Sequence, residues 1–499
     1  MLFTSLQYLV FLPAVVLLFW LMPKKWRLPM LLVASYYFYA SFIWQFLALI
    51  LPMTLFNWVW GKVLHKDHSN KTLLGVGIAV NLLLLGFFKY TNFFADSIGS
   101  LMPLLGAANP HWSFNIILPL GISFFTFEFI HYLFEIYRGN KPIDNFVLFA
   151  LFAAFFPTQI AGPIKRYPDF VAQMQADNKF ELKYFDEGIP LIVIGLAKKL
   201  LLADNLAIFV QMGMEHPSFY SGPELWLFAY AFAFQIYFDF SGYTDVGRGS
   251  AMLFGYHIPI NFNMPYIASN MADFWRRWHI SLSTWLRDYL FIPLGGSRGG
   301  RWLTNRNLFL TMALGGLWHG ASWNFAVWGV FHGLALIVHR EFSQFKNGNL
   351  TLKNFLDNPA VAPVWGYLSM LLTFHAVCIG WVFFRIQDMG AATLMIKRML
   401  TFRPFYSMPS PQHFVVMKQE LPVVVPVVMV MVALLLLTNL PLSRINESGI
   451  FKKTPAPLQA VFCATLIVAM IVFQPDTSAP YYILPVLSKV FDIKNDCRH

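Results

Sequence analysis

The sequence has 499 residues, of which 57% are hydrophobic and only 12% are charged, against about 25% charged residues in soluble proteins. Together with a mean hydropathy of +0.54, these values indicate a chain whose main solvent is lipid. They disfavour soluble enzymes, nucleic-acid-binding proteins, disordered scaffolds and secreted disulfide-rich domains. The formal net charge is +11, but the basic residues form short clusters between apolar runs, as the positive-inside rule places them beside lipid head groups.

The N-terminal segment is a predicted membrane helix. From Met1 to Pro23 no residue is charged, and Lys24, Lys25 and Arg27 follow at once. Because a cleaved signal peptide carries its basic residues before the apolar stretch, we expect this helix to stay in the membrane with the N-terminus outside the cytoplasm. Residues 28–61 again lack charge and exceed the about 20 residues of one crossing, which predicts a hairpin of two short helices.

Further uncharged runs of nearly membrane-spanning length lie at 72–88, 111–127, 145–164, 307–339, 359–384, 421–443 and 454–475. We therefore expect an all-α polytopic membrane protein with about eleven transmembrane helices. Charged residues interrupt shorter runs between about 185 and 240, which predicts protein-buried, interfacial or re-entrant helices there. Pro and Gly at 119–121 and 161–163 indicate broken helices. No internal repeat or linker is visible, so 1–499 is predicted to be one membrane domain.

Residues 239–340 concentrate polar, aromatic and ionisable side chains between membrane-length runs, and such a buried cluster indicates function. Asn270 and Asp273 have the spacing of an N-cap and its N3 partner. They predict the start of a helix that continues to Tyr289 and ends before Pro293, Gly295 and Gly296. On a continuous helix, one protein-facing side carries Trp275, His279 and Ser283.

Six arginines and no lysine lie between Asp273 and Arg306. Guanidinium groups bind phosphate or carboxylate in a two-pronged geometry. Two interpretations stay open: a cytoplasmic loop that contacts lipid phosphates, or a binding site for an anionic donor such as coenzyme A. The arginines that would hold the donor phosphates are Arg276, Arg277, Arg287 and Arg298.

His319 stands in a Trp-His-Gly sequence inside the run 307–339, which contains no Asp, Glu, Lys or Arg. A histidine at membrane depth needs a partner or a task, so a structural and a catalytic role are both open. His332 and His339 share a helical face, but His332 and His319 lie on roughly opposite faces of a continuous helix. With no carboxylate in the run, a metal site is improbable, and we expect His332 and His339 to be structural or interfacial.

Residues 274–283, Phe-Trp-Arg-Arg-Trp-His-Ile-Ser-Leu-Ser, and the later Trp-His-Gly at 318–320 resemble the membrane-bound O-acyltransferase (MBOAT) family, most closely its bacterial alginate O-acetylase branch. Supporting blocks at 118–127, 156–164 and 235–245 extend the similarity over about 118–340. The resemblance implies a multi-helix enzyme with a central funnel or tunnel. It places His319 at the position of the catalytic histidine and His279 at that of a second histidine of the same tunnel.

The resemblance further implies a bacterial inner-membrane enzyme that uses acetyl-CoA as acyl-donor substrate, binds no permanent cofactor, and passes acetyl groups to a periplasmic SGNH-type partner that modifies an exported polysaccharide. His319 would act as general base. An oxyanion donor could be His279, a backbone N–H or Asn324. Further tunnel or supporting residues would be Trp275, Trp278, Trp318, Gln235 and Asp239. Alternatives are D-alanyl transfer from a carrier protein to teichoic acid, a non-catalytic polysaccharide or lipid-linked sugar transporter, and a membrane scaffold.

Overall fold

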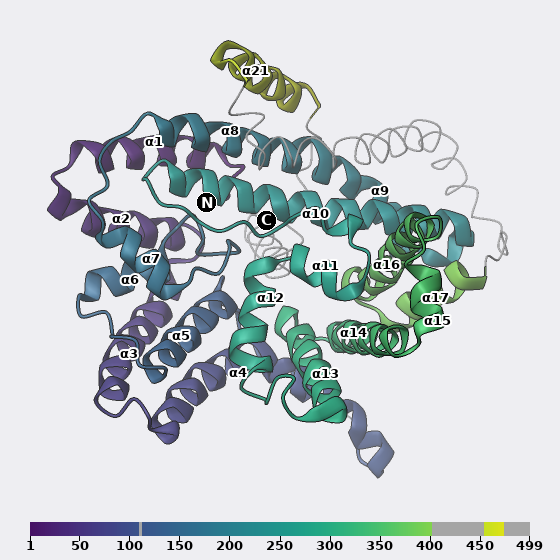
Figure 1. The fold of residues 1–499 in the computed structure, drawn as a ribbon. Coiled ribbons are helices and arrows are strands. Elements are labelled where there is room, and N and C mark those ends of the chain that lie inside the picture. The colour runs from purple at the N-terminus through teal and green to yellow at the C-terminus, as the bar shows by residue number, and fades with distance from the viewer. Residues whose placement is uncertain (109–111, 402–453, 474–499) are drawn as a thin grey trace. The chain divides into compact units, whose positions relative to one another are not determined.

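The computed structural model describes residues 1–108, 112–401 and 454–473, and all regular elements in these ranges are helical (Figure 1). This confirms the all-α prediction for the described residues. The chain divides into two compact units. Unit 1 contains the described residues 1–196 and 243–259, and unit 2 contains 197–242 and the described residues from 260 onward. The expectation of one membrane domain over 1–499 stays a prediction.

Besides the last residues, 243–252, of a helix that begins in unit 2, the described part of unit 1 contains eight α-helices and two short 3-10 helices. They are α1 (Leu6–Leu21), α2 (Lys24–Ala40), η1 (Trp44–Phe46), α3 (Leu47–Lys66), α4 (Lys71–Leu101), η2 (Met102–Leu105), α5 (Ile122–Tyr137), α6 (Phe146–Ala154), α7 (Tyr167–Gln175) and α8 (Lys183–Ala197). Helices α1 and α2 pack together, α2 packs on α6, and α3 and α4 both pack on α5. The predicted pair of short helices between 28 and 61 is confirmed as α2 and α3.

Buried polar pairs join the apolar helices of unit 1. Asn57 on α3 and Asn81 on α4 exchange two side-chain hydrogen bonds of 3.0 and 2.8 Å. Lys165 donates one hydrogen bond to Glu128 on α5 and one to Thr158, each 2.7 Å long. All three side chains are buried. Between helices in lipid, an unsatisfied polar group is costly, so such pairs fix which helix faces which.

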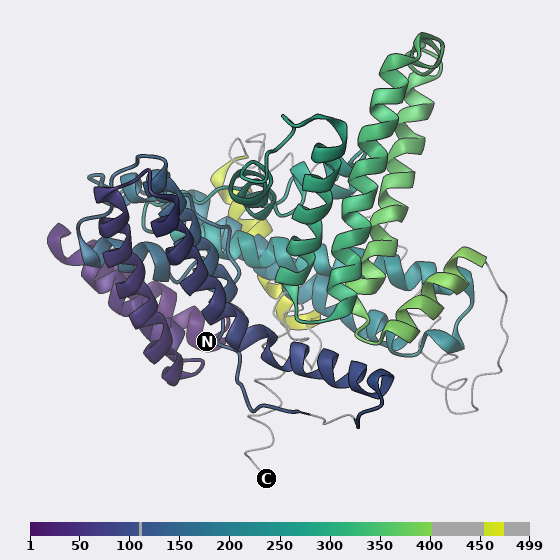
Figure 2. The same cartoon turned by 90° about the horizontal axis from the view of Figure 1, so that it is seen from below.

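Unit 2 begins in the middle of a long helical region. Its elements are η3 (Lys198–Ala203, a π-helix), α9 (Asp204–Glu215), η4 (Pro217–Phe219), most of α10 (Gly222–Met252), η5 (Pro265–Ile267), α11 (Met271–Arg277), α12 (Ile280–Leu286), η6 (Arg287–Phe291, a π-helix), α13 (Gly300–His319), α14 (Trp323–Gly348), α15 (Leu350–Leu356), α16 (Ala362–Arg385), α17 (Met389–Thr401) and α21 (Ala456–Phe473). Helices α13 and α14 form an antiparallel hairpin, and Figure 2 shows α14 and α16 side by side.

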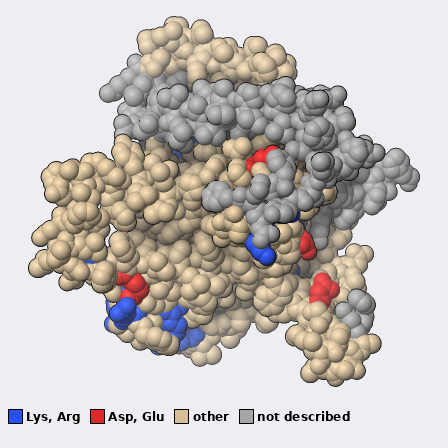
Figure 3. All heavy atoms as spheres, turned by 90° about the vertical axis from the view of Figure 1, so that its right-hand side faces the viewer, with Lys and Arg blue, Asp and Glu red and all other residues tan. Residues whose placement is uncertain are grey.

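Three helices in the described ranges are long and apolar enough to cross a membrane: Trp44–Lys66, Lys71–Leu105 and Ala362–Arg385. Leu6–Leu21 and Pro457–Phe473 are shorter apolar helices. In the face shown in Figure 3, charged side chains form only a few small groups on the described surface. These features support a membrane protein, whereas the total of about eleven crossings stays a prediction, and the crossing predicted at 421–443 lies outside the described residues.

Three predicted crossings are wrong in their helical extent. The run 111–127 is not a single helix, because α5 begins only at Ile122, after Gly121 adopts a φ of +73°. The run 145–164 contains only the nine-residue α6, about 13 Å long at 1.5 Å per residue and therefore too short to span. The run 307–339 is divided between α13 and α14. The predicted breaks at 119–121 and 161–163 are confirmed, since neither segment is helical.

Candidate active site

The segment that carries His279 is a broken helix. As predicted, Asn270 caps α11 by accepting a 2.8 Å hydrogen bond from the Asp273 backbone N–H. The predicted continuous helix is wrong, however, because α11 ends at Arg277 and His279 adopts a left-handed φ of +43° before α12. In a residue with a side chain this conformation costs free energy, and it persists only where surrounding contacts impose it. Trp275, His279 and Ser283 therefore do not lie on one helical face.

Asn261 supplies the contacts that hold this break. Its backbone carbonyl accepts from the Ile280 N–H at 2.9 Å, and its Oδ1 accepts from the Ser281 N–H at 3.0 Å and the Ser281 hydroxyl at 2.9 Å. The same Oδ1 lies 3.2 Å from His279 Nδ1. Sequence reasoning missed Asn261 because it precedes His279 by 18 residues and belongs to no recognised pattern.

This arrangement determines how the His279 imidazole is protonated. The Ser281 backbone N–H can only donate, so the Asn261 atom that it meets is the carbonyl oxygen. An oxygen acceptor requires His279 Nδ1 to carry the hydrogen, which leaves Nε2 of the neutral ring as a hydrogen-bond acceptor. The ring is only 1% exposed, and the edge-on Phe240 ring lies 4.7 Å away between centroids. His279 therefore presents a fixed tautomer.

Replacing Asn261 with Ala is expected to destabilise the protein by about 1–3 kcal/mol, because buried donors at Ser281 and His279 lose their acceptor. The matched control is Asn263→Ala. Asn263 bonds to Arg277 through its backbone N–H and carbonyl, and Ala keeps both of these groups. Thermal unfolding in detergent measures both variants. Equal unfolding temperatures for the two would contradict a clamping role for Asn261.

His319 is the last residue of α13, at the point where the chain reverses into α14. Its half-buried imidazole contacts three aromatic rings, with centroid distances of 4.9 Å to Trp318, 5.0 Å to Trp328 and 5.2 Å to Phe384. Thus α13, α14 and α16 together wall the ring while part of its surface stays accessible. Apolar walls beside an accessible imidazole suit proton transfer away from bulk water.

Two glycines allow the close approach of α13 and α14 that positions His319. A Cβ on Gly316 would lie 2.3 Å from the Phe325 carbonyl oxygen, and one on Gly329 would lie 2.4 Å from the Met312 carbonyl oxygen. Both distances are to rigid helix backbone. Small residues at such crossings let helix backbones pack directly in membrane proteins.

Gly316→Ala is expected to cost at least about 1–3 kcal/mol, the usual penalty of overpacking, because the helices must move apart. Gly366→Ala on α16 is the matched control, since no atom lies within 4 Å of its added Cβ, and there Ala is expected to gain about 0.5–1 kcal/mol by helix propensity. Opposite shifts in unfolding temperature are expected. A rise for Gly316→Ala would contradict the close contact.

His332 lies at the centre of an aromatic cluster that we name the indole cluster, consisting of Trp275, Trp328, Trp381 and His332 itself. The His332 ring is fully buried, 4.7 Å from the Trp328 ring and 5.2 Å from the Trp275 ring. The Trp328 ring contacts both His332 and His319. Within the described parts of the chain, both His332 ring nitrogens and the indole N–H groups of Trp275 and Trp328 have no hydrogen-bond partner.

Such unpaired buried polar groups cost about 1–3 kcal/mol each, and their grouping around Trp328, which contacts His319, makes them part of the candidate site. The sequence interpretation of His332 as structural or interfacial overlooked this grouping. The hairpin of α13 and α14, in place of a continuous helix over the run 307–339, brings His319 against Trp328, which lies one turn before His332 on α14. In the sequence, the four-residue spacing of Trp328 and His332 was the signal that these two rings lie side by side on one helix.

The other predicted supporting residues are Trp278, Asn324, Gln235 and Asp239. The Trp278 ring centroid lies 4.9 Å from that of Trp381 in the indole cluster. Asn324 is buried and donates a 2.8 Å hydrogen bond from Nδ2 to the Ile386 carbonyl. Gln235 and Asp239 lie one turn apart on α10, and both are buried. The Gln235 amide has no hydrogen-bond partner among the described residues.

Asp239 belongs to a buried ionic cluster. Lys199 Nζ lies 2.7 Å from an Asp204 carboxylate oxygen and 3.0 Å from one of Asp239, and no side chain of the three is more than 4% exposed. The segments between about 185 and 240 were predicted to be protein-buried, interfacial or re-entrant, and within them Lys199 and Asp204 are buried whereas Glu215 is exposed. The cluster joins η3, α9 and α10 and was not predicted as a unit.

The predicted donor-binding arginines differ in availability. Arg276 and Arg298 are exposed and form no ion pair with described residues, whereas Arg287 pairs with Asp288 at 2.7 Å and Arg277 with Asp273 at 3.0 Å. Further along, hydrogen bonds from Asn305 and Arg301 hold the pKa of Glu341 below its usual range, linking the start of α13 to α14. Both interpretations of the arginine segment remain compatible with this placement.

Apolar helices of membrane-spanning length around buried histidines and paired charges support an integral membrane protein. Residues 125–380 match the family model described as MBOAT, membrane-bound O-acyltransferase family. The chain belongs to this family, in the branch of the alginate O-acetylases, and is an acyltransferase.

The relatives carry related names. The chain is 41% identical over 410 residues to a probable alginate O-acetylase AlgI of Pseudomonas aeruginosa. The aligned region covers 81% of this chain and 75% of that protein. It is 37% identical over 411 residues to a peptidoglycan O-acetyltransferase of Helicobacter pylori, covering 76% and 74%. A teichoic acid D-alanyltransferase of Bacillus subtilis is 32% identical over 305 residues, covering 58% and 74%.

Proposed function

We propose that this acyltransferase moves an acetyl group from cytoplasmic acetyl-CoA across a bacterial inner membrane for O-acetylation of an exported polysaccharide. Similarity to relatives named for alginate and peptidoglycan O-acetylation supports the acetyl group and the glycan acceptor. The observation that carries the assignment of the site is His319, a half-buried imidazole walled by Trp318, Trp328 and Phe384. It is the general base in this proposal.

In the proposed reaction, a neutral nitrogen of His319 accepts the proton of the acceptor hydroxyl while the hydroxyl oxygen attacks the thioester carbonyl carbon. The C–O bond forms, the tetrahedral oxyanion collapses, and the C–S bond breaks. The imidazolium then returns the proton to the leaving coenzyme A thiolate. The thioester is already activated, so ATP is not required, and the aromatic walls limit hydrolysis by water.

The geometry narrows the choice of oxyanion donor in this mechanism. His279 uses Nδ1–H toward Asn261 and presents Nε2 as an acceptor, which suits proton transfer better than donation to an oxyanion. Asn324 donates one of its two amide N–H groups to the Ile386 carbonyl, which leaves the second available as an oxyanion donor. The oxyanion donor in this proposal is therefore Asn324 or a backbone N–H group, and His279 is assigned to a second proton-accepting position.

The proposed orientation places the N-terminus in the periplasm and the arginine segment on the cytoplasmic side, where Arg276 and Arg298 are available for the phosphates of acetyl-CoA. The acetyl group then leaves toward the periplasm. Its first acceptor is the serine hydroxyl of an SGNH-type partner or the glycan hydroxyl itself, and both use the same chemistry at His319.

Among the alternatives, D-alanyl transfer has less support, because the teichoic acid D-alanyltransferase is 32% identical over 58% of this chain, against 41% over 81% for the alginate O-acetylase. Membership of an acyltransferase family argues against a non-catalytic transporter or scaffold.

The proposal is tested with inverted membrane vesicles that contain the full chain, its exported polysaccharide and the periplasmic fraction. Vesicles receive either acetyl-labelled acetyl-CoA or a carrier protein loaded with labelled D-alanine. We expect base-labile label in polysaccharide from acetyl-CoA only. Label from the D-alanyl carrier, or no label from acetyl-CoA while the protein is present at normal abundance, would contradict the proposal.

A further inference from the structure

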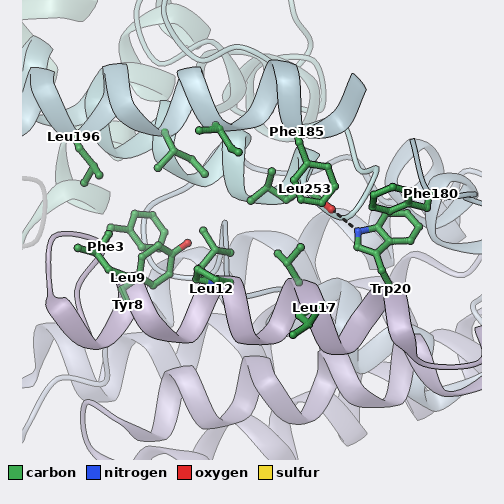
Figure 4. A pocket seen from close by; sticks show the side chains of 14 residues that line it. Phe3, Tyr8, Leu9, Leu12, Leu17, Trp20, Phe180, Phe185, Leu196 and Leu253 are labelled. Atoms are coloured by element: carbon green, nitrogen blue, oxygen red, sulfur yellow. Dashed lines mark hydrogen bonds between the residues drawn. The ribbon is translucent and has the colours of Figure 1, made fainter. Parts of the chain in front are cut away.

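Unit 1 contains an apolar groove between α1 and α8 that the acyl-transfer site does not use. It has a volume of about 550 Å³ and lies wholly within unit 1. Figure 4 shows side chains from both helices pointing into it, among them Leu12 and Trp20 from α1 and Phe185 from α8. The polar atoms of its lining are engaged, since Tyr8 Oη lies 2.7 Å from Ser250 Oγ and Trp20 Nε1 donates to the Leu253 carbonyl at 2.9 Å. The groove therefore offers only apolar contacts.

One end of the groove carries cationic and aromatic groups. The Arg27 guanidinium lies 5.0 Å from the Trp20 ring centroid and donates to the Asn178 carbonyl at 3.0 Å, which joins the end of α1 to the segment before α8. Lys24 pairs with Asp177 at 2.8 Å. Lys25 and Lys179 are exposed and form no ion pair with the described residues. Lys179 directly precedes the lining residue Phe180, whose ring lies 5.4 Å from the Trp20 ring, and Lys25 follows the paired Lys24, so two exposed lysines adjoin the Trp20 end in sequence. An amphipathic indole such as Trp20 suits the membrane interface.

We propose that this groove binds one phospholipid, with an acyl chain between α1 and α8 and its phosphate near Lys25 and Lys179. From Tyr8 to Trp20 the lining of α1 extends about 18 Å at 1.5 Å per residue. This length matches one leaflet, which is half of the roughly 30 Å hydrocarbon core. The apolar lining fits the chain, and the basic end complements the negative phosphate.

The test is native mass spectrometry of the purified full-length protein, delipidated and then titrated with phosphatidylglycerol. The groove variant is Leu9→Trp with Leu17→Trp, two lining residues that are 50% and 61% exposed. The control is Val10→Trp with Leu18→Trp on the same helix, 65% and 46% exposed and outside the lining. Because all four residues are already exposed, both variants should fold.

We expect one tightly retained lipid in the wild type and the control, and at least tenfold weaker binding in the groove variant. Lys25→Ala with Lys179→Ala should weaken binding about tenfold, whereas Lys66→Ala with Lys71→Ala, which removes two exposed lysines elsewhere in unit 1, should not. Unchanged binding in the groove variant, equal affinity for diacylglycerol, or a dimer peak that only the groove variant loses would overturn the proposal. Acyl transfer is not the readout, so this result is independent of the proposed function.

Discussion

His319→Ala is expected to lower acetylation of the surface polysaccharide by about 10²- to 10⁴-fold, the usual contribution of a general base. The imidazole is half-buried at the end of α13, so its loss should leave packing between the helices largely intact. The measurement is base-released acetate from purified polysaccharide of cells that carry each variant. Membrane abundance and unfolding temperature are measured in parallel, because a misfolded protein would give the same loss of acetate.

The matched control for this prediction is His339→Ala, which removes another half-buried histidine, on α14. It should keep acetylation within about twofold. His279→Ala should also reduce acetylation, because it removes the Nε2 acceptor. Asn261→Ala should reduce it too, because the His279 tautomer that presents Nε2 as acceptor then loses its hydrogen-bond partner at Nδ1. Normal acetate from well-expressed His319→Ala would remove this residue from the mechanism.

Lys199→Met is expected to lower the free energy of unfolding by about 3–5 kcal/mol, because it leaves two carboxylates buried without their cation. Lys199 lies within 3.0 Å of both Asp204 and Asp239, and all three side chains are almost fully buried. The measurement is thermal or denaturant unfolding in detergent. Lys397→Ala, which removes an exposed lysine on α17, is the control and should change stability by no more than about 0.5 kcal/mol.

A neutralised cluster distinguishes lost charge balance from lost packing. Combining Lys199→Met with Asp204→Asn and Asp239→Asn should recover much of the stability, since no buried charge is then left unpaired. If Lys199→Met unfolds at the same temperature as Lys397→Ala, the cluster has no structural role. If the triple variant is no more stable than Lys199→Met, the loss comes from packing instead.

Local sequence signals predicted individual elements well. The charge-free run after Arg27 and its excessive length predicted two helices, which are α2 and α3. The Asn270 cap was predicted correctly because an N-cap depends on atoms only three residues apart. The run 359–384 corresponds closely to α16, since apolar length alone sets such a helix.

Contacts between distant residues explain the failures. Helical periodicity joined residues 270–289 into one helix, whereas Asn261, outside that window, holds the break at His279. The run 307–339 lacked charge throughout, so hydropathy gave no sign of the reversal between His319 and Trp323. The pairing of Lys199 with Asp239 likewise depends on a helix forty residues away.

By itself the sequence determined that this protein is a membrane acyltransferase with His319 and His279 as its candidate histidines, because composition indicates apolar helices and the local motifs carry the family resemblance. Only the tertiary structure decided the tautomer of His279, the aromatic walls of His319 and the position of His332 beside Trp275 of α11. The physical reason is that protonation and burial depend on atoms brought together across helices, and no local pattern records which helices meet.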